Sequence, residues 1–405
     1  MENKSILDQI ITNQKAEEIA RLNAVEIIAS IFNSLNERER DVLSRRFGLQ
    51  GGEKETLENI GKVHNLTRER IRQIETTGVK KLRQIESLNE HIKGLKKVIT
   101  QLLEEHGGLM EKKYLLNSLV KFSVDGISSR ADSNENVHKS NLEFLISKLL
   151  HTEFEEVNNS KVFKESFKFK FQDLEHLEDL ALKLVEEIEK TKKIFFTEEL
   201  IDLTKELETF KNNPEKFKTP NNVDISGVLK KEFFSEDPDL INENKVLYTI
   251  LQAHKKVEQN KFGHWGINDW REVKPKTIND KIYLILKNNG KPMHFVEISE
   301  RINQTGFDKK KANPATVHNE LILDKKYILV GRGLYSLKEW GYQSGTVADV
   351  IIDVMEKNNN EPLTRDEVIQ RVLDQRIVKK ATIILALMNK EKFERLDNGK
   401  YRLKK

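Results

Sequence analysis

The sequence predicts a mainly α-helical protein in which an N-terminal helix-turn-helix is followed by tandem winged-helix domains with small β-hairpin wings. Two observations predict this fold class. Residues 56–83 contain two amphipathic helical patterns separated by a short polar turn. Beyond residue 90, sets of three helical patterns are each followed by an alternating segment with Gly, Asn or Asp at its centre, as in a β-hairpin.

The first helix of the helix-turn-helix is expected to begin at Thr56, because its hydroxyl can accept a hydrogen bond from a free backbone N–H. Leu57, Ile60 and Val63 recur at the spacing of one helix face, so we expect all three to line the buried side. Residues 64–66 should form the turn that leads into the second helix.

The second helix is expected to run from Arg68 to Arg83, with Thr67 as its N-cap. Its buried stripe is predicted to consist of Ile71, Ile74, Gly78 and Leu82. The other positions are polar, and the stretch from Lys62 to Arg83 holds seven Lys/Arg against two Glu. Such an excess is expected where a protein neutralises DNA phosphates.

One exposed face at the start of this second helix carries side chains suited to base recognition. Arg68, Glu69, Arg72 and Gln73 fall at i, i+1, i+4 and i+5, and therefore on the part of the helix that enters the major groove in this motif. Arginine pairs with guanine, glutamine with adenine, and glutamate accepts from cytosine, each good contact giving roughly 1–3 kcal/mol of discrimination. The alternative interpretation is a solvated helix face without a ligand.

The segment LNERERDVLSRRFGL (Leu35–Leu49), followed by TLENIGKVHNLTRERIRQIE, resembles region 4 of sigma-70 family bacterial sigma factors over about residues 17–84. In that family, region 4 binds the minus-35 promoter element and the flap of the RNA polymerase β subunit. The resemblance implies that Arg68, Glu69 and Gln73 touch bases. It places near the DNA backbone the side chains of Thr67, Arg70, Arg72 and Lys80.

The same resemblance implies a surface for the β flap on the preceding helices, around Ile27–Leu35 and Val42–Phe47. The alternative for these apolar residues is ordinary core packing. A sigma factor that starts transcription also needs a region 2 with aromatic residues, and Phe32 is the sole aromatic before Phe47. We therefore expect a protein that is not a self-sufficient sigma factor.

The composition limits the remaining possibilities. The 405 residues suffice for several domains, and 33% charged residues with a net charge of +4 indicate a soluble protein. No secretory signal and no long apolar run is evident, so we expect a cytoplasmic bacterial protein associated with the nucleoid and no membrane contact. The absence of cysteine excludes disulfides and thiolate metal sites.

Four hairpin-like segments recur along the chain. KKYILVGRGLYSLKEW (Lys325–Trp340) aligns without a gap onto Lys255–Trp270, and both contain two lysines, one glycine and a final tryptophan at the same positions. FERLDNGKYRL (Phe393–Leu403) aligns onto Tyr327–Leu337, and Phe154–Phe163 resembles the start of that last segment. We interpret each as a β-hairpin with a tight turn.

Three helices are predicted before each hairpin, which together make a winged helix. The predicted helices are Leu95–Glu105, Tyr114–Val120 and Leu142–Leu150; Leu174–Lys190, Thr197–Leu207 and Val246–His254; Thr277–Lys287, His294–Ile302 and Thr316–Leu323; and Thr346–Met355, Thr364–Leu373 and Lys380–Asn389. The polar stretches 123–140 and 209–239 are predicted to be loops or partly ordered insertions.

The third copy resembles the HARE-HTH domain over about residues 265–342, on the segments WGINDWREVKPKTINDKIYLILKNNGKPMHFVEISERI, PATVHNELI and YILVGRGLYSLKEWGY. That winged helix is found in the delta subunit of RNA polymerase, in some restriction endonucleases and in chromatin proteins, which implies a DNA-related setting. The whole chain is similar to bacterial proteins that join sigma region 4 to HARE-HTH domains. The predicted domains are 1–90 (sigma region 4-like), 91–171 (winged-helix-like), 172–271 (winged-helix-like and acidic), 272–342 (HARE-HTH) and 343–405 (C-terminal winged helix).

Charge differs between the predicted winged helices. Residues 272–343 hold thirteen Lys/Arg against eight Asp/Glu, and residues 363–405 hold twelve against six, so both could neutralise phosphates. Residues 175–208 hold eleven acids against five lysines and should repel a duplex, so we expect a protein-facing or spacer role there.

Candidate DNA contacts in the two late copies follow from their position before or on the third helix and on the wing. The alternative for each is solvated surface charge. In the third copy they are Lys309, Lys310, Lys311, Asn319, Lys325 and Arg332, and in the last copy Arg376, Lys379, Lys380, Lys400 and Arg402.

We expect no enzyme, no cofactor, no metal site and no small-molecule ligand, because the chain contains no P-loop, nucleophile elbow or metal-spaced His/Cys cluster. His294 and His318 are interpreted as capping or packing residues. The favoured hypothesis is a DNA-binding transcription factor whose partners are promoter DNA and RNA polymerase. The alternatives are a polymerase-associated scaffold with secondary DNA binding, and a sensor of modified DNA.

Overall fold

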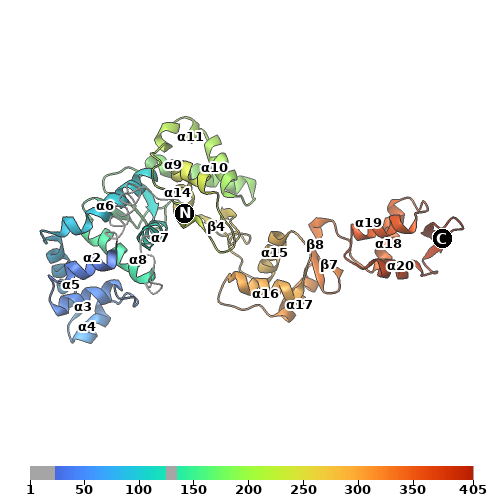
Figure 1. Ribbon diagram of the computed structural model, residues 1–405, viewed down its shortest axis with the longest axis horizontal. Helices are drawn as coiled ribbons and strands as arrows, with labels where there is room; N and C mark the ends of the chain where they lie inside the picture. The colour runs from blue at the N-terminus through green and yellow to red at the C-terminus, as the bar shows by residue number, and fades with distance from the viewer. Residues whose placement is uncertain (1–22, 125–134, 405) are drawn as a thin grey trace, which may run out of the picture. The chain divides into compact units, whose positions relative to one another are not determined.

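The computed structural model describes residues 23–124 and 135–404, and it is mainly helical with small antiparallel sheets. The predicted fold class is confirmed (Figure 1). The described residues form two compact units. Unit 1 extends to Gln259 and includes Gly263–Asn268, and unit 2 consists of Asn260–Phe262 and the chain from Asp269 onward. Residues 17–22, where the resemblance to region 4 begins, lie outside the described residues.

Unit 1 begins with four helices, of which the last two form the helix-turn-helix. Their bounds are α2 (Ala24–Phe32), α3 (Glu37–Phe47), α4 (Leu57–His64) and α5 (Arg68–Arg83). The second helix of the motif has the bounds that the sequence predicts, because Thr67 caps its first turn.

Two repeats of three helices and a small sheet complete unit 1. The first comprises α6 (Leu88–Glu105), β1 (Leu109–Glu111), α7 (Lys112–Val124), α8 (Glu135–Phe144) continued by a π-helix η1 (Leu145–Leu149), β2 (Phe154–Val157) and β3 (Ser166–Phe169). The second comprises α9 (Glu175–Thr191), α10 (Thr197–Glu206), the short helices α11 (Glu208–Lys211), η2 (Pro214–Phe217), α12 (Ser226–Leu229) and α13 (Pro238–Glu243), then α14 (Lys245–Ala253), β4 (Val257–Gln259) and β5 (Trp265–Ile267).

Unit 2 holds two further repeats, whose helices match the predicted ones closely. The first comprises α15 (Ile278–Asn289), β6 (Met293–His294), α16 (Phe295–Thr305), α17 (Pro314–Leu323), β7 (Tyr327–Gly331), β8 (Leu334–Leu337) and a 3₁₀ turn, η3 (Lys338–Trp340). The second comprises α18 (Val347–Lys357), α19 (Arg365–Leu373), α20 (Lys380–Leu387), β9 (Phe393–Arg395) and β10 (Tyr401–Leu403).

All four repeats share a strand pairing that the sequence did not predict. The residues just before the second helix pair with the second strand of the hairpin, as a third strand in two repeats and as a single isolated bridge in the other two. The pairs are Met110 with Phe167, Phe195 with Trp265, Met293 with Tyr335, and Leu363 with Tyr401. These segments are too short to show an alternating pattern, which is why only the paired structure reveals them.

Two predictions about local structure were wrong. In the first repeat, the hairpin does not close within Phe154–Phe163, because β2 pairs with a strand that begins at Ser166. The stretch 209–239 contains short helices rather than loops alone, since Pro238 at the first position and Asp237 as N-cap start α13. Residues 125–134 of the other predicted loop lie outside the described residues.

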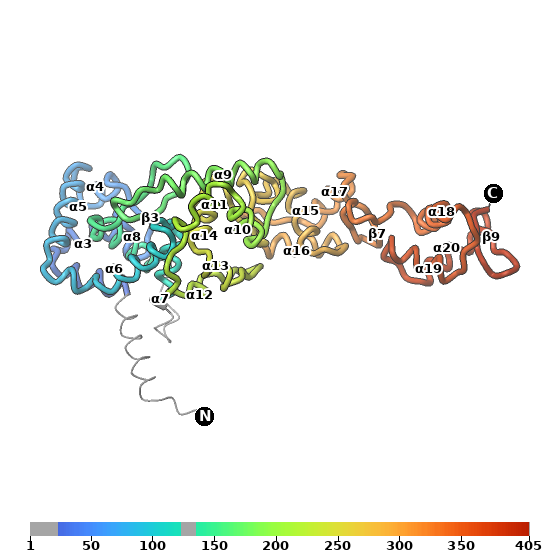
Figure 2. Tube along the Cα trace, turned by 90° about the horizontal axis from the view of Figure 1, so that it is seen from above, coloured from blue at the N-terminus to red at the C-terminus, as the bar shows by residue number. Residues whose placement is uncertain are grey.

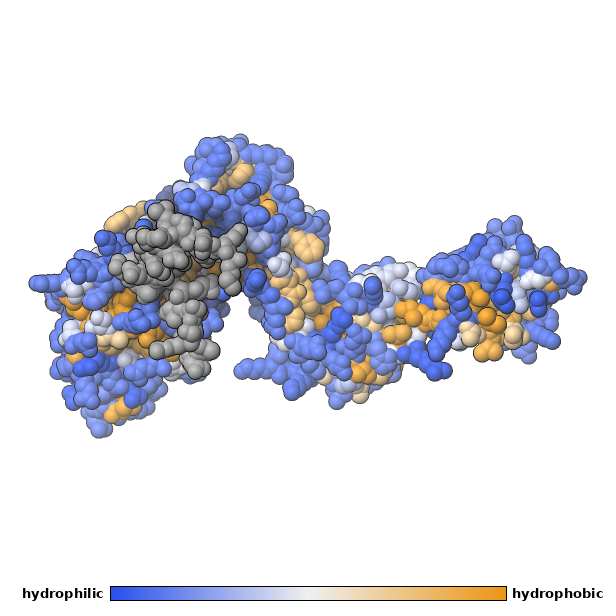
Figure 3. Space-filling model, in the orientation of Figure 1, coloured by the Kyte–Doolittle hydropathy of each residue, from blue (hydrophilic) through white to orange (hydrophobic). Residues whose placement is uncertain are grey.

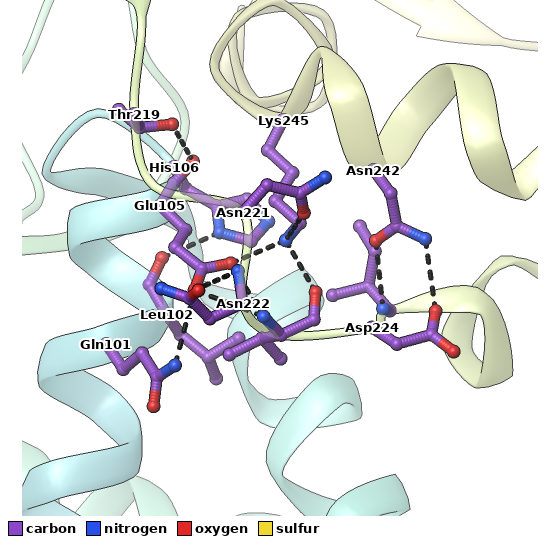
Figure 4. Close-up of polar contacts among 12 residues, drawn as sticks. Gln101, Leu102, Glu105, His106, Thr219, Asn221, Asn222, Asp224, Asn242 and Lys245 are labelled. Atoms are coloured by element: carbon purple, nitrogen blue, oxygen red, sulfur yellow. Dashed lines mark hydrogen bonds and ion pairs between the residues drawn. The ribbon is translucent and has the colours of Figure 1, made fainter.

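A buried ion pair joins the two repeats of unit 1. Lys245, at the start of α14, donates through Nζ to Glu105 at the end of α6 at 2.5 Å, and both side chains are 1% exposed (Figure 4). Glu105 also accepts from the backbone N–H groups of Asn222 and Val223 at 2.9 and 3.0 Å. Burial alone would raise the pKa of Glu105, but these donors together hold that pKa below its usual value.

Helix α14 lies at the centre of unit 1, in contact with β1, α9, α10 and α13 (Figures 1 and 2). At this position water does not reach the ammonium group of Lys245, so the charge needs a partner within the protein. Because a buried charge without a partner is costly, Glu105 and its neighbours fix how α14 sits against the end of α6.

We predict that Lys245→Met destabilises unit 1 by about 3–5 kcal/mol, since it leaves Glu105 charged and buried. The double variant Glu105→Gln/Lys245→Met should lose less, because it removes both charges. Hydrogen exchange of the amides in α6 and α14 of the full chain measures the local free energy of opening. Equal losses in the single and double variants would contradict this account.

We also predict that unit 1 loses stability in acid through His254. Burial, together with the nearby charges of Lys164 and Lys256, lowers the pKa of His254 to about 4. Since an unfolded histidine titrates near pH 6.5, stability is full above that pH and decreases as the pH falls toward 4, by up to about 3 kcal/mol. The His254 Nδ1 accepts from Lys256 N–H at 2.9 Å. His254→Asn keeps an acceptor there and should flatten the pH dependence in hydrogen exchange.

Candidate nucleic-acid interface

Capping residues set both ends of the helix-turn-helix. Thr56 Oγ1 accepts from Asn59 N–H at 3.2 Å, and Thr67 Oγ1 accepts from Arg70 N–H at 3.2 Å. Asn65 ends α4 in the left-handed conformation, with φ of 55°. Asparagine tolerates this backbone better than most residues, so the turn follows from the local sequence.

Gly61 lets the turn close against α4. The Leu66 N–H donates to the Gly61 carbonyl at 2.9 Å. A Cβ atom at position 61 would lie 2.6 Å from the Leu66 carbonyl oxygen, which belongs to the backbone and cannot rotate away. The close approach of α4 and the start of α5 therefore requires glycine.

A small apolar core holds the helix-turn-helix on α3. Val42 of α3, Ile60 of α4 and Ile71 of α5 are fully buried, with Leu57, Leu66 and Ile74 packed around them. Gly78 is buried close to Leu43. Val63 was predicted to be buried and is 53% exposed, because α4 is only two turns long and its last turn extends beyond α5.

All seven residues that the sequence assigns to DNA are exposed on or beside α5: Thr67, Arg68, Glu69, Arg70, Arg72, Gln73 and Lys80. Glu69, Gln73 and Lys80 lie on the side of α5 opposite Ile71 and Leu82, which are fully buried, and the other four flank the start of the helix. This placement suits a helix that enters a major groove with its N-terminal half.

Two of the residues predicted to contact bases pair with arginines predicted to lie near the DNA backbone. Arg72 donates to both carboxylate oxygens of Glu69, through Nε at 2.9 Å and Nη2 at 2.7 Å. The hydrogen bond from Arg72 holds the pKa of Glu69 below its usual value. Arg70 Nη1 donates to Gln73 Oε1 at 3.0 Å. DNA binding would exchange these exposed contacts for contacts to bases and phosphates at little cost, since exposed pairs contribute little stability.

A groove of about 1110 Å³ borders α5 on the side of α3. Arg70, Gln73 and Thr77 line it from α5, and Arg38 and Arg40 line it from the first turn of α3. Both α3 arginines are exposed, so they lie where a DNA strand beside the recognition helix would pass. Sequence reasoning missed them, although the charged run Glu37–Arg40 was visible.

The apolar residues predicted to bind a flap lie in the interior instead. Within Ile27–Leu35 and Val42–Phe47, the large apolar side chains are buried or half-buried. Phe144 of α8 covers them, with its ring centroid 6.3 Å from that of Phe32 and 4.9 Å from that of Phe47. Core packing is therefore the correct interpretation of these residues.

Two polar contacts reinforce this cover. Asn141 of α8 donates through Nδ2 to the Leu49 carbonyl at 2.9 Å, in a buried position. Arg83, the last residue of α5, donates through Nε to the Lys148 carbonyl of the π-helix at 2.8 Å. A π-helical turn frees carbonyls that an α-helix would use internally, so this turn can hold the end of the recognition helix.

The late candidates are dispersed over unit 2. In the third repeat, the loop before α17 holds Lys309, Lys310 and Lys311, α17 or the residues just after it hold Asn319 and Lys325, and the turn of the hairpin holds Arg332. In the last repeat, the candidates on or near α20 and its hairpin are Lys379, Lys380, Lys400 and Arg402. Arg376 was predicted to contact DNA and is only 8% exposed, because the adjacent Ile377 pairs through its N–H with the Val330 carbonyl of the neighbouring wing.

Three further observations concern metal binding, the roles of two histidines, and membrane insertion. Among residues 23–124 and 135–404, no three His, Asp or Glu side chains are grouped so as to hold a metal ion. His294 caps α16 by accepting from Val296 N–H, and His318 packs on Phe295, with ring centroids 4.5 Å apart. None of the described helices is both long and apolar enough to cross a bilayer.

Comparison with known proteins assigns the helix-turn-helix. Residues 31–84 match the family Sigma-70, region 4. Similar relatives are RNA polymerase sigma factor SigA1 of Synechococcus elongatus (48% identical over 67 residues, 16% of this chain and 17% of that protein) and SigA of Nostoc (53% over 58 residues, 14% and 15%). SigA of a Bacillus species is 44% identical over 86 residues (20% and 23%).

The chain thus spans less than a quarter of the length of these relatives. No solved structure matches the chain. The family match covers α3, α4 and α5 and makes a sigma-like, DNA-binding role plausible for them.

We predict that Gly61→Ala disrupts the helix-turn-helix, because the new Cβ meets a backbone carbonyl. The expected loss is about 1–3 kcal/mol of local stability, measured by hydrogen exchange of the α4 and α5 amides. Gly52→Ala is the matched control, since a Cβ there has no heavy atom within 4 Å. Equal protection in the two variants would show that the turn does not depend on glycine.

Proposed function

We propose that this protein is a DNA-binding transcription factor that inserts α5 into the major groove of a short element similar to a minus-35 promoter site, and that it works beside RNA polymerase. In this role Arg68, Glu69 and Gln73 contact bases. The residues proposed to contact the backbone are Thr67, Arg70, Arg72 and Lys80, joined by Arg38 and Arg40. The setting is the bacterial cytoplasm and nucleoid, and no catalytic step is assigned.

A single observation carries the proposal: a rigidly held helix exposes a polar face of the right chemistry. The apolar side of α5 packs on α3, and its last residue is fixed to η1 at 2.8 Å. The free face then presents an arginine, a glutamate and a glutamine within two turns. Those three side chains recognise three different base edges, and phosphate contacts alone would not need that variety.

The scaffold alternative, in which the helix-turn-helix occupies the β flap, receives less support. The apolar residues on which it depends pack inside unit 1 beneath Phe144. Polymerase would have to displace α8 to reach them. We therefore propose that contact with polymerase uses another surface. We propose further that the repeats after the helix-turn-helix are winged helices, the one over residues 265–342 being of the HARE-HTH type.

The test compares sequence preference with affinity. The full chain is mixed with a pool of random duplexes, the bound fraction is sequenced, and the preferred site is then titrated by fluorescence anisotropy. Arg68→Ala/Gln73→Ala should relax the preference and weaken the best site by about ten- to a hundredfold. Lys80→Ala should instead weaken all duplexes about equally and reduce the dependence on salt.

Lys338→Ala is the control, because this exposed lysine lies outside α5 and outside the groove. It should leave the preferred sequence unchanged. A wild-type chain that enriches no sequence from the pool at moderate salt would refute the proposal.

A further inference from the structure

The third helix of the last repeat exposes apolar side chains where a DNA-contacting helix would expose polar ones. Leu385 and Met388, one turn apart at the end of α20, are 68% and 65% exposed. The buried side of the same helix is provided by Ile383 and Leu387. The sequence of α20 is apolar on both sides, so packing alone leaves an apolar surface in water.

This surface continues onto the neighbouring wing. Ile377 is 43% exposed and Leu329 of β7 is 44% exposed, and the Ile377 N–H donates to the Val330 carbonyl next to Leu329. Figure 3 shows apolar surface from β7 to α20 in unit 2. We define the C-terminal apolar face as Leu329, Ile377, Leu385 and Met388.

Lysines lie at both ends of α20. Lys379 and Lys380 stand at its start, Lys390 follows its end, and all three are exposed. Because Leu385 and Met388 offer no hydrogen bonds to base edges, this combination suits a protein with acidic and apolar side chains better than a duplex. A symmetric pairing of two such faces would bring lysines of both copies together, which charge repulsion opposes.

Unit 1 exposes a surface of the complementary kind on α9. Glu175, Asp179, Leu182, Glu186 and Glu189 fall on one exposed stripe of that helix, and Leu182 is 47% exposed. Residues 175–208 hold eleven acids against five lysines, whereas residues 363–405 hold twelve Lys/Arg against six acids. The opposite face of α9 is used inside unit 1, where Leu177, Leu180 and Leu184 are buried.

Charged side chains lie at comparable axial distances from the exposed leucine on α9 and on α20. Along an α-helix at 1.5 Å per residue, Asp179 lies about 4.5 Å and Glu175 about 10.5 Å from Leu182. On α20, Lys380 lies about 7.5 Å from Leu385 by the same measure. On both helices, charged side chains thus lie within about two turns of an exposed apolar residue.

We propose that the C-terminal apolar face binds helix α9 of a second copy of this chain. Such an interface joins two different surfaces, so a pair of copies keeps one free surface of each kind. Association is then head to tail and can continue from copy to copy. The acidic repeat, which a duplex repels, thereby becomes the means by which several DNA-binding chains assemble beside one another.

The first test is sedimentation velocity of the full chain over a range of concentrations. The wild type should form species larger than a monomer as concentration rises, and less so at high salt. Leu385→Ser/Met388→Ser should raise the dissociation constant by at least about tenfold, because both side chains are central to the face. Both are mostly exposed, so the fold is little affected.

Charge reversal makes the test specific for the two surfaces. Asp179→Lys/Glu186→Lys and Lys379→Glu/Lys380→Glu should each abolish self-association. Mixed together, these two variants should associate again, because their intact surfaces are complementary to each other and so are their reversed surfaces. A chain carrying all four reversals should regain association, since the charges are then exchanged.

Lys309→Glu/Lys310→Glu is the matched control, because these exposed lysines lie in the loop before α17. It should associate like the wild type. Three results would overturn the proposal: a wild type that stays monomeric, a mixture of the reversal variants that forms no dimer, or an apolar-face variant that loses duplex affinity while its self-association is unchanged. The last result would assign α20 to DNA.

Discussion

The burial of one side of α5 against α3 is the constraint on which the proposed DNA-contacting surface depends. Ile71 and Leu82 have no exposed area, and Val42 and Leu43 of α3 meet that side of α5. A helix has one orientation that buries a given apolar stripe, so every other side chain of α5 takes a fixed direction. The polar face is thus positioned by a hydrophobic contact that involves none of its own residues.

Polar contacts between distant segments then hold unit 1 together. Asn141 reaches the Leu49 carbonyl, and Lys245 reaches Glu105 across 140 positions of sequence. Each group is buried and would be costly without its partner, so these contacts select one arrangement of the repeats more than they add to stability. In the same arrangement, Phe144 packs against both Phe32 and Phe47.

The four repeats have one plan and different surfaces. Each pairs the segment before its second helix with its hairpin, yet α9 carries an acidic stripe and α20 an apolar one. The shared plan comes from buried positions, because these decide which helices pack together. The exposed positions are free to differ, so fold similarity among the repeats does not imply a common ligand.

The sequence by itself determined the helix-turn-helix, because Thr56, Thr67 and Asn65 act through contacts within a few residues and the period of α5 separates its two sides. Its seven predicted DNA-directed residues are exposed for the same reason. Four features follow only from the tertiary structure. Phe144 packs over Phe32, Arg376 is buried, Val63 is exposed, and the segment before each second helix pairs with the hairpin. Each of these depends on which distant segments meet, and neither periodicity nor capping carries that information.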